Sequence, residues 1–201
     1  YISKKKNSSG GLNVANNQTS SDIYYQQYIP GNTYSVSFIS SEIDSQILGF
    51  NQLFLVKDNA EYPYMHAGAV TLNLDNKQLN YYKKWINDFS YQYQLNGFCS
   101  IDYKIYDNKI YIIDINPRLS GTYRLYKKKY RNLMCHHIGL ASEKLMSVSN
   151  KYYAYIILFA KNDYMADESI YKIKDISDIP VPGVTVKKNM PILTLNFKSN
   201  D

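Results

Sequence analysis

Two acidic residues and an asparagine near the middle of the chain could together bind a metal ion. Asp114 and Asn116 are two residues apart in a run typical of a β-strand, so both side chains point to one face. The pair Asp107-Asn108 predicts a two-residue hairpin turn, which places Asp102 on the paired strand roughly across from Asp114. Two carboxylates and a carboxamide oxygen suit Mg²⁺ or Mn²⁺, with phosphate and water completing the coordination.

An arginine directly follows these candidate ligands. Pro117 fixes the turn after the strand, and Arg118 can then place a permanent positive charge over a phosphoryl oxygen or a carboxylate. The alternative is that Asp102 and Asp114 are ordinary solvent-facing residues of a half-exposed hairpin, because alternating polar positions are normal there. The run from Asp114 to Arg118, with its terminal Pro-Arg pair, favours a functional site.

A lysine and a glycine-containing loop near the start of the chain could bind phosphate. Lys4 supplies charge, and the small residues after it let backbone N–H groups approach an anion. These loop residues are Ser8, Ser9, Gly10 and Gly11. A plain surface loop is the alternative interpretation of this segment.

A predicted strand that ends in Pro-Gly could offer backbone donors and acceptors to a purine. Its last residues are Gln27, Tyr28 and Ile29, followed by Pro30-Gly31. By itself this pattern indicates only a strand and a turn. His66, in a loop with Pro63 and Gly68, is either an ordinary loop histidine or part of an acceptor site.

The elements that would position these residues are mostly strands. We predict loop structure over residues 1–22 and 61–68, two strands within 23–40, and further strands over 48–56, 98–106, 109–116, 153–159 and within 179–197. Helices are expected over residues 75–96 and 126–146. The first has an apolar face with spacings of 3, 4, 3 and 4, formed by Leu79, Tyr82, Ile86, Phe89 and Tyr93.

Composition excludes several classes of protein. The 201 residues, 45% hydrophobic and 20% charged, are typical of one large or two small globular domains. Cys99 and Cys135 are too few for a disulfide scaffold, and no CxxC pair exists. No run reaches the roughly 18 apolar residues of a membrane helix, and nothing resembles a signal peptide, so we expect a cytoplasmic protein that does not bind membranes. Only three of the 23 basic residues are Arg, which argues against nucleic-acid binding despite the net charge of +6.

In this order, the segments resemble the ATP-grasp superfamily of carboxylate–amine ligases. That family has a strand with a lysine, a Gly-rich loop, a strand leading to a hinge, and an acidic strand pair ending in acid-x-Asn-Pro-Arg. The resemblance implies phosphate contacts at the lysine and loop, adenine contacts at the hinge, metal ligation by the acidic pair and asparagine, and a reaction-centre arginine. The matching residues are Lys4, Ser8, Ser9, Gly10 and Gly11, then Gln27, Tyr28 and Ile29, then Asp102, Asp114 and Asn116, and Arg118.

The tail extends the resemblance to predicted ATP-dependent carboligases related to biotin carboxylase. The segments 178–183 and 190–192, each with proline, look like the closing β segment of that subgroup. The implied fold is α+β: the C-terminal portion of an ATP-grasp fold, an antiparallel sheet with flanking helices and a closing β segment. Residues 1–45 would belong to the small lobe, with phosphate loop and hinge, and residues 46–201 to the large lobe.

The activity implied by the resemblance is ATP-dependent ligation. Mg-ATP between two lobes would convert an acid to an acyl phosphate, from which an amine or related nucleophile displaces phosphate. The expected cofactors are ATP and Mg²⁺ or Mn²⁺, and the expected partners are a small-molecule acid and amine. The resemblance is compatible with a homodimer. Three positions depart from the family: Thr33 stands near the usual ribose-binding carboxylate, Asp114 replaces Glu, and Lys4-Lys5 replaces Lys-Pro.

The acceptor-binding lobe that precedes this region in the family is missing. We therefore expect a fragment, or a chain completed by a partner, that is an enzyme only in its full-length form and inactive alone. Two other functions stay open. Thr33, the degenerate loop and the missing lobe also fit a non-catalytic nucleotide-binding protein, whereas the charge alone would suggest a basic surface that binds RNA or anionic lipid.

Overall fold

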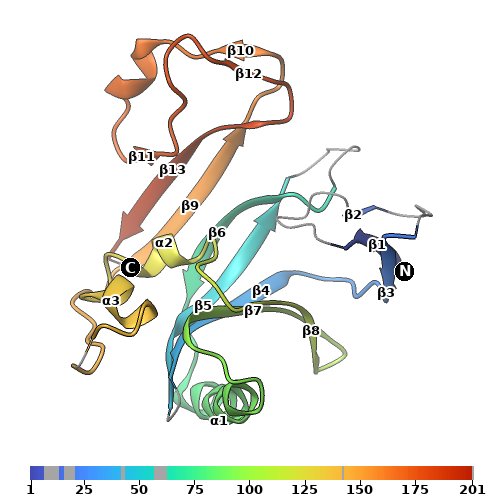
Figure 1. Ribbon diagram of the computed structural model, residues 1–201, viewed down its shortest axis with the longest axis vertical. Helices are drawn as coiled ribbons and strands as arrows, with labels where there is room; N and C mark the ends of the chain where they lie inside the picture. Colours follow the sequence, from blue (N-terminus) through green and yellow to red (C-terminus); the bar gives the residue numbers. More distant parts are fainter. Residues whose placement is uncertain (7–13, 16–20, 42–43, 57–62, 142, 201) are drawn as a thin grey trace.

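The computed structural model describes residues 1–6, 14–15, 21–41, 44–56, 63–141 and 143–200, and it has the α+β fold expected from the sequence. A small antiparallel sheet has the strand order β2-β1-β3, and a large one the order β11-β13-β9-β6-β5-β4-β7-β8 (Figure 1). The strands of the small sheet are β1 (Ile2–Lys5), β2 (Val14–Ala15) and β3 (Ile23–Gln26). Those of the large sheet are β4 (Thr33–Ser40), β5 (Ser45–Leu55), β6 (His66–Leu72), β7 (Gly97–Tyr106), β8 (Lys109–Asn116), β9 (Tyr152–Phe159), β11 (Ile176–Ser177) and β13 (Pro191–Ser199).

One face of the large sheet is covered by α1 (Asn76–Gln92), at the bottom of Figure 1. The predicted apolar stripe of this helix is confirmed, since Tyr82 and Ile86 are buried in a core cluster with strand residues such as Phe38 and Ile101. This cluster fixes the alternation of β4 and β7. Every second side chain points toward α1, so the residues between them must point to the opposite face.

The opposite face has its own core at one end and a polar region at the other. Leu125, Tyr126 and Leu133 pack there against Phe98 and Tyr155. Phe98 begins the row of β7 residues on this face, and the residues that follow it in that row are polar. The polar region therefore lies beside an apolar core that holds it in place.

The predicted hairpin over residues 98–116 is confirmed, including its register. Asp102 pairs with Asp114 across β7 and β8. Asp107 and Asn108 have φ values of 50° and 55°, the left-handed conformation that a tight two-residue hairpin turn requires. A β-bulge follows Asp102, because Tyr103 pairs with Ile112 and leaves Ile113 as an extra residue in β8.

The predicted helix over residues 126–146 is wrong. In its place are two short helices, α2 (Tyr123–Tyr126) and α3 (Leu133–His137). Asn132 has a left-handed backbone with φ of 54°, and Gly139 has φ of 73°, so neither position can continue a helix. Core packing of apolar residues, rather than helical periodicity, sets the path of this segment.

Two predicted loops contain strands. Residues Ile2–Lys5 and Val14–Ala15 form β1 and β2, and β6 begins at His66 and runs between β5 and β9. The lysines of β1 and the glycine of β6 led to the loop predictions, because neither residue type is typical of a strand. Gly68 has φ of 155°, and a Cβ there would collide with the carbonyl oxygen of Tyr155, so this glycine permits the close approach of β6 to β9.

The C-terminal part of the chain protrudes from the large sheet on the long pair β9 and β13 (Figure 1). It contains β10 (Tyr164–Met165), a 3₁₀ helix (Glu168–Lys172), β11 and β12 (Thr185–Val186). None of the helices in the described ranges is long and apolar enough to cross a membrane. β3 and β4, predicted as consecutive strands, belong to different sheets, while the division into lobes at residue 45 stays a prediction.

Candidate functional site

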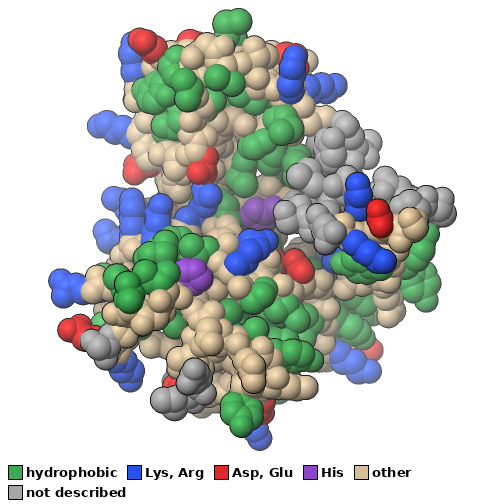
Figure 2. All heavy atoms as spheres, in the orientation of Figure 1, with side chains coloured by type: hydrophobic (Ala, Val, Ile, Leu, Met, Phe, Trp, Pro, Cys, Tyr) green, Lys and Arg blue, Asp and Glu red, His purple; other side chains and the backbone are tan. Residues whose placement is uncertain are grey.

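A cavity of about 410 Å³ lies between the small sheet and the polar face of the large sheet. Side chains from both sheets, from the connection between them and from the loop after β8 line it. In Figure 2 a hollow opens below the protruding C-terminal part, and charged side chains of both signs and a histidine gather at its margin. The cavity therefore combines an enclosed volume with a concentration of polar groups.

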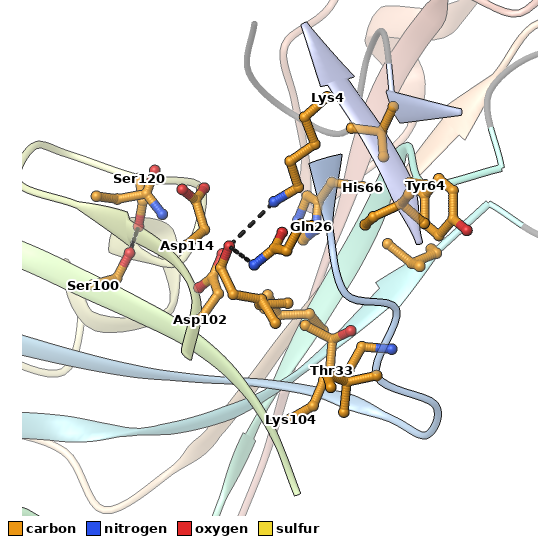
Figure 3. Close-up of a pocket in the computed structure, with 18 of the residues that line it drawn as sticks. Lys4, Gln26, Thr33, Tyr64, His66, Ser100, Asp102, Lys104, Asp114 and Ser120 are labelled. Atoms are coloured by element: carbon orange, nitrogen blue, oxygen red, sulfur yellow. Dashed lines mark hydrogen bonds between the residues drawn. The ribbon is translucent and has the colours of Figure 1, made fainter. Parts of the chain in front are cut away.

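The floor of the cavity is built from rows of polar residues across neighbouring strands. Ser35, Asp102 and Asp114 lie side by side on β4, β7 and β8, because the registers of both strand pairs align them. The next row consists of Ser37, Ser100 and Asn116. The predicted ligand set of two carboxylates and an amide is thus gathered on one face of the sheet. Figure 3 shows Asp102 and Asp114 of this set.

Asp102 has a strongly perturbed pKa. Burial raises it from 3.8 to about 6, the neighbouring Ser35 side chain lowers it, and the charge of Asp114 raises it. The charges of Lys4 and Arg118 oppose the increase. The carboxylate is therefore ionised at neutral pH but in an unfavourable environment, which a bound cation would improve.

Lys4 reaches across from β1 to the large sheet. Its Nζ donates a hydrogen bond of 3.1 Å to the carbonyl oxygen of Ile113, and Gln26 Nε2 donates to the same oxygen at 3.4 Å (Figure 3). Ile113 is the bulge residue of β8, so the irregular strand presents this carbonyl to the small sheet. The contact places an ammonium group in the cavity close to both acidic residues.

Arg118 lines the cavity from the loop that follows β8. Its guanidinium donates to Asn116 Oδ1 at 3.0 Å and to the Leu119 carbonyl at 3.1 Å. Asn116 is buried, whereas Arg118 is exposed to the cavity. The positive charge is thus held beside the candidate metal ligands and remains accessible to a substrate.

A histidine and a tyrosine form a further wall of the cavity. His66 Nε2 and the Tyr155 hydroxyl are 2.7 Å apart, and the Arg124 guanidinium lies 4.8 Å from the centre of the Tyr155 ring. Burial, and secondarily the charge of Arg124, lowers the pKa of His66 to about 4, so its imidazole is neutral at pH 7. Arg124 also forms a 2.7 Å ion pair with Asp178 of the C-terminal part.

The structure brings most of the predicted site residues together. The cavity is lined by Lys4, Gln27, Tyr28, Ile29, Asp102, Asp114, Asn116 and Arg118. The predicted phosphate-loop residues Ser8, Ser9, Gly10 and Gly11 lie outside the described residues. The roles of all these residues stay predictions.

The sequence interpretation missed several cavity residues. They are Tyr64, Ser100, Lys104, Ser120, Thr122 and Tyr155. Ser100 and Lys104 had a readable signal, because they alternate with Asp102 on the polar face of β7. Tyr155 had none, because its place depends on how β9 pairs with β6.

The comparisons with known proteins agree with the fold described above. A family model described as an ATP-grasp domain matches residues 1–122. An uncharacterized protein of Methanocaldococcus jannaschii is 33% identical over 197 residues, which cover 92% of this chain and 44% of that relative. The chain therefore spans less than half the length of this relative.

Solved structures share the fold at low sequence identity. The biotin carboxylase domain dimer of the Hydrogenobacter thermophilus 2-oxoglutarate carboxylase, described in complex with MgADP, ADP and bicarbonate, is 11% identical, with a TM-score of 0.68, and the match covers 99% of this chain and 53% of that one. An L-amino acid ligase of Bacillus licheniformis is 12% identical, with a TM-score of 0.63, covering 87% of this chain and 48% of that one. With the family model matching more than half of its residues and the same architecture in these structures, the chain belongs to the ATP-grasp family.

Proposed function

We propose that the cavity binds Mg-ATP and that the full-length protein is an ATP-dependent ligase. It would join a carboxylic acid to an amine or a related nucleophile through an acyl phosphate. The observation that carries this proposal is the row of Asp102 and Asp114 next to Asn116, with Lys4 and Arg118 lining the same cavity. Such an arrangement suits a polyphosphate and its counter-ion.

The donor set fits Mg²⁺ or Mn²⁺. Asp102, Asp114 and Asn116 would hold the ion, which would supply positive charge against the phosphates. The raised pKa of Asp102, caused first by burial and further by the charge of Asp114, supports a cation between the two carboxylates. Asn116 Oδ1 already accepts from Arg118, and its second lone pair leaves room for an ion.

The nucleotide would lie along the cavity from the connection between the sheets to Arg118. Gln27, Tyr28 and Ile29 would contact the adenine, and Lys4 the phosphates. The loop with Ser8, Ser9, Gly10 and Gly11 would cover those phosphates with backbone N–H groups. Thr33 on β4 lines the cavity and would lie near the ribose.

Arg118 would stabilise the charge that develops in the reaction. A carboxylate oxygen of the acid attacks the γ-phosphorus, the bond to the β-phosphate oxygen breaks, and ADP leaves. The amine then attacks the carbonyl carbon of the acyl phosphate, and phosphate leaves. A guanidinium fixed beside the reacting oxygens favours both steps without rearranging.

The similar structures support this assignment and suggest the wider assembly. The Hydrogenobacter carboxylase is described with MgADP and as a dimer, and the Bacillus protein as an L-amino acid ligase. We propose that a further lobe or a partner chain supplies the acceptor site. We further propose that the protein forms a homodimer and acts in the cytoplasm on small molecules.

The test is a calorimetric titration of the 201-residue chain with ATP, once in Mg²⁺ and once in EDTA. We expect ATP to bind more tightly with Mg²⁺ than with EDTA. Asp114→Asn should weaken ATP binding in Mg²⁺ about tenfold and so remove most of that difference. Asp88→Asn, on the exposed side of α1, is the matched control and should change nothing. Equal affinity in Mg²⁺ and EDTA for the unmodified chain would disprove the metal site. Mg-ATP binding without ADP formation in the full-length protein would favour a non-catalytic nucleotide-binding role.

A further inference from the structure

A series of hydrogen-bonded side chains runs from the core along the cavity floor to the arginine loop, which we define as residues 117–122. The Tyr126 hydroxyl donates to Asn51 Oδ1 at 2.6 Å, and Asn51 Nδ2 donates to Ser37 Oγ at 3.2 Å. The series continues between Ser37 and Thr122 at 2.8 Å, between Thr122 and Ser120 at 2.9 Å, and from Ser100 to Ser120 at 3.0 Å. We call these six residues the hydroxyl network.

The hydroxyl network is buried in a place where apolar residues would suffice for folding. Ser37 and Asn51 are 0% exposed and Thr122 is 3% exposed. The other face of the same strands is filled by apolar residues such as Phe38 and Ile101. Buried polar groups are tolerated only when hydrogen-bonded, so a connected network of this length imposes one arrangement on the groups that it joins.

The groups that the hydroxyl network joins are the sheet and the arginine loop. Ser120 and Thr122 follow Arg118 by two and four residues, and their hydroxyls attach the loop to β4 and β7. Ser100 is the cross-strand partner of Asn116, the residue that accepts a hydrogen bond from the Arg118 guanidinium. The loop is therefore fixed to the sheet on both sides of the arginine.

The arginine loop is also confined from the side of β9. A Cβ at Gly121 would lie 2.8 Å from the Tyr155 hydroxyl, so the loop passes this ring without room for a side chain. Arg118 itself is exposed and has many rotatable bonds, so its position depends on a fixed backbone and on its two hydrogen bonds.

We infer that Thr122 is a positioning residue: through Ser37 and Ser120 it fixes the arginine loop so that Arg118 faces the phosphoryl group in transfer. This inference rests on the proposed function. Thr122 contributes little to binding the nucleotide itself, because the proposed adenine and metal contacts come from other segments. Its effect should therefore be felt where charge develops, not in ground-state nucleotide binding.

The test compares two probes, MgADP alone and MgADP with aluminium fluoride, which imitates a phosphoryl group in transfer. We expect the unmodified chain to bind the second probe more tightly. Thr122→Val keeps the shape and removes the hydroxyl; it should weaken binding of the second probe about tenfold and change MgADP affinity less than twofold. Thr122→Ser should restore the tight binding.

Thr71→Val is the matched control, since Thr71 is buried on β6, donates to the Tyr153 carbonyl and does not line the cavity. It should leave both affinities unchanged. Ser37→Ala breaks the same network from the sheet side, and should reproduce the split if Thr122→Val does not fold. Unchanged affinity for the second probe in the folded variants, or an equal loss for both probes, would overturn the inference. Failure of the unmodified chain to bind MgADP would instead overturn the proposed function.

Discussion

Asp102 is a carboxylate that the fold holds in an unfavourable environment. Half-buried and opposite a second carboxylate, it has a pKa of about 6 instead of 3.8. In the folded state its ionised form is thus less favourable than in the unfolded chain. The sign of its contribution follows: ionised Asp102 lowers stability at high pH, and the loss disappears as pH falls through the folded pKa and then the unfolded one.

We therefore predict that Asp102→Asn stabilises the protein at pH 8 while it abolishes Mg²⁺-dependent ATP binding. The expected gain in the free energy of unfolding is roughly 1–3 kcal/mol, and it should vanish below about pH 4, where Asp102 is protonated in both states. Urea denaturation at several pH values measures this. Asp88→Asn is the control, and a variant less stable than the unmodified protein at pH 8 would contradict the prediction.

At this scale the sequence predicted residues that share a motif and missed those that depend on tertiary contacts. Asp114, Asn116 and Arg118 are neighbours in the chain, so strand periodicity places them together. Thr122 and Tyr155 gain their positions from contacts with β4 and β6, about which local sequence says nothing. The serines at 35 and 37, which alternate with the apolar residues Val36 and Phe38 in one strand, were the available signal for a polar face.

Among the elements, β6 depends most on a single residue. Gly68 combines φ of 155° with a backbone carbonyl where a Cβ would be. We predict that Gly68→Ala lowers the free energy of unfolding by at least about 3 kcal/mol, because a strand carbonyl cannot move away as a side chain can. Gly139→Ala is the matched control: its φ is 73°, nothing lies within 4 Å, and about 1 kcal/mol is expected. Similar losses for both, in thermal or urea denaturation, would refute the steric explanation.

The success or failure of the element predictions has a local cause. The hairpin over residues 98–116 is correct because Asp107-Asn108 encodes its own turn geometry. The helix over residues 126–146 is wrong because Asn132 turns left-handed and the apolar residues around it are used by a core that the periodicity cannot reveal. Strands with lysine or glycine, such as β1 and β6, were not predicted, because their pairing rather than their composition makes them strands.

For the whole molecule, the α+β class and the family were predictable, since strand-rich patterning and the motif ending in Arg118 span most of the chain. The assignment of strands to different sheets was not, because it depends on long-range pairing. β3 and β4 are consecutive in sequence, yet the six-residue connection with Gln27, Tyr28 and Ile29 is followed by a change of sheet. The cavity exists because of this change.

The chain alone should bind Mg-ATP without completing a ligation. It spans 44% of its Methanocaldococcus relative, and the proposed function assigns its cavity residues to the nucleotide and the metal rather than to an acid or amine. We expect no ADP formation above background from the 201-residue chain with panels of acids and amines, in an assay that detects activity of the full-length protein. Turnover by the chain alone would show that it holds a complete acceptor site.

The hydrogen bond from Lys4 to the bulge carbonyl of Ile113 also joins the two sheets. An ammonium group carries one charge and occupies one position. An ammonium has three N–H donors, so under the proposed function a nucleotide need not displace the carbonyl: the exchange is partial, with Lys4 Nζ drawn toward a phosphate oxygen and its contact with the carbonyl weakened. Linkage makes this exchange reciprocal: a tighter contact between the sheets weakens nucleotide affinity by the same factor by which bound nucleotide loosens that contact. One extra residue in β8 thereby contributes to a dissociation constant, and the mobility of the small sheet becomes a reporter of nucleotide occupancy.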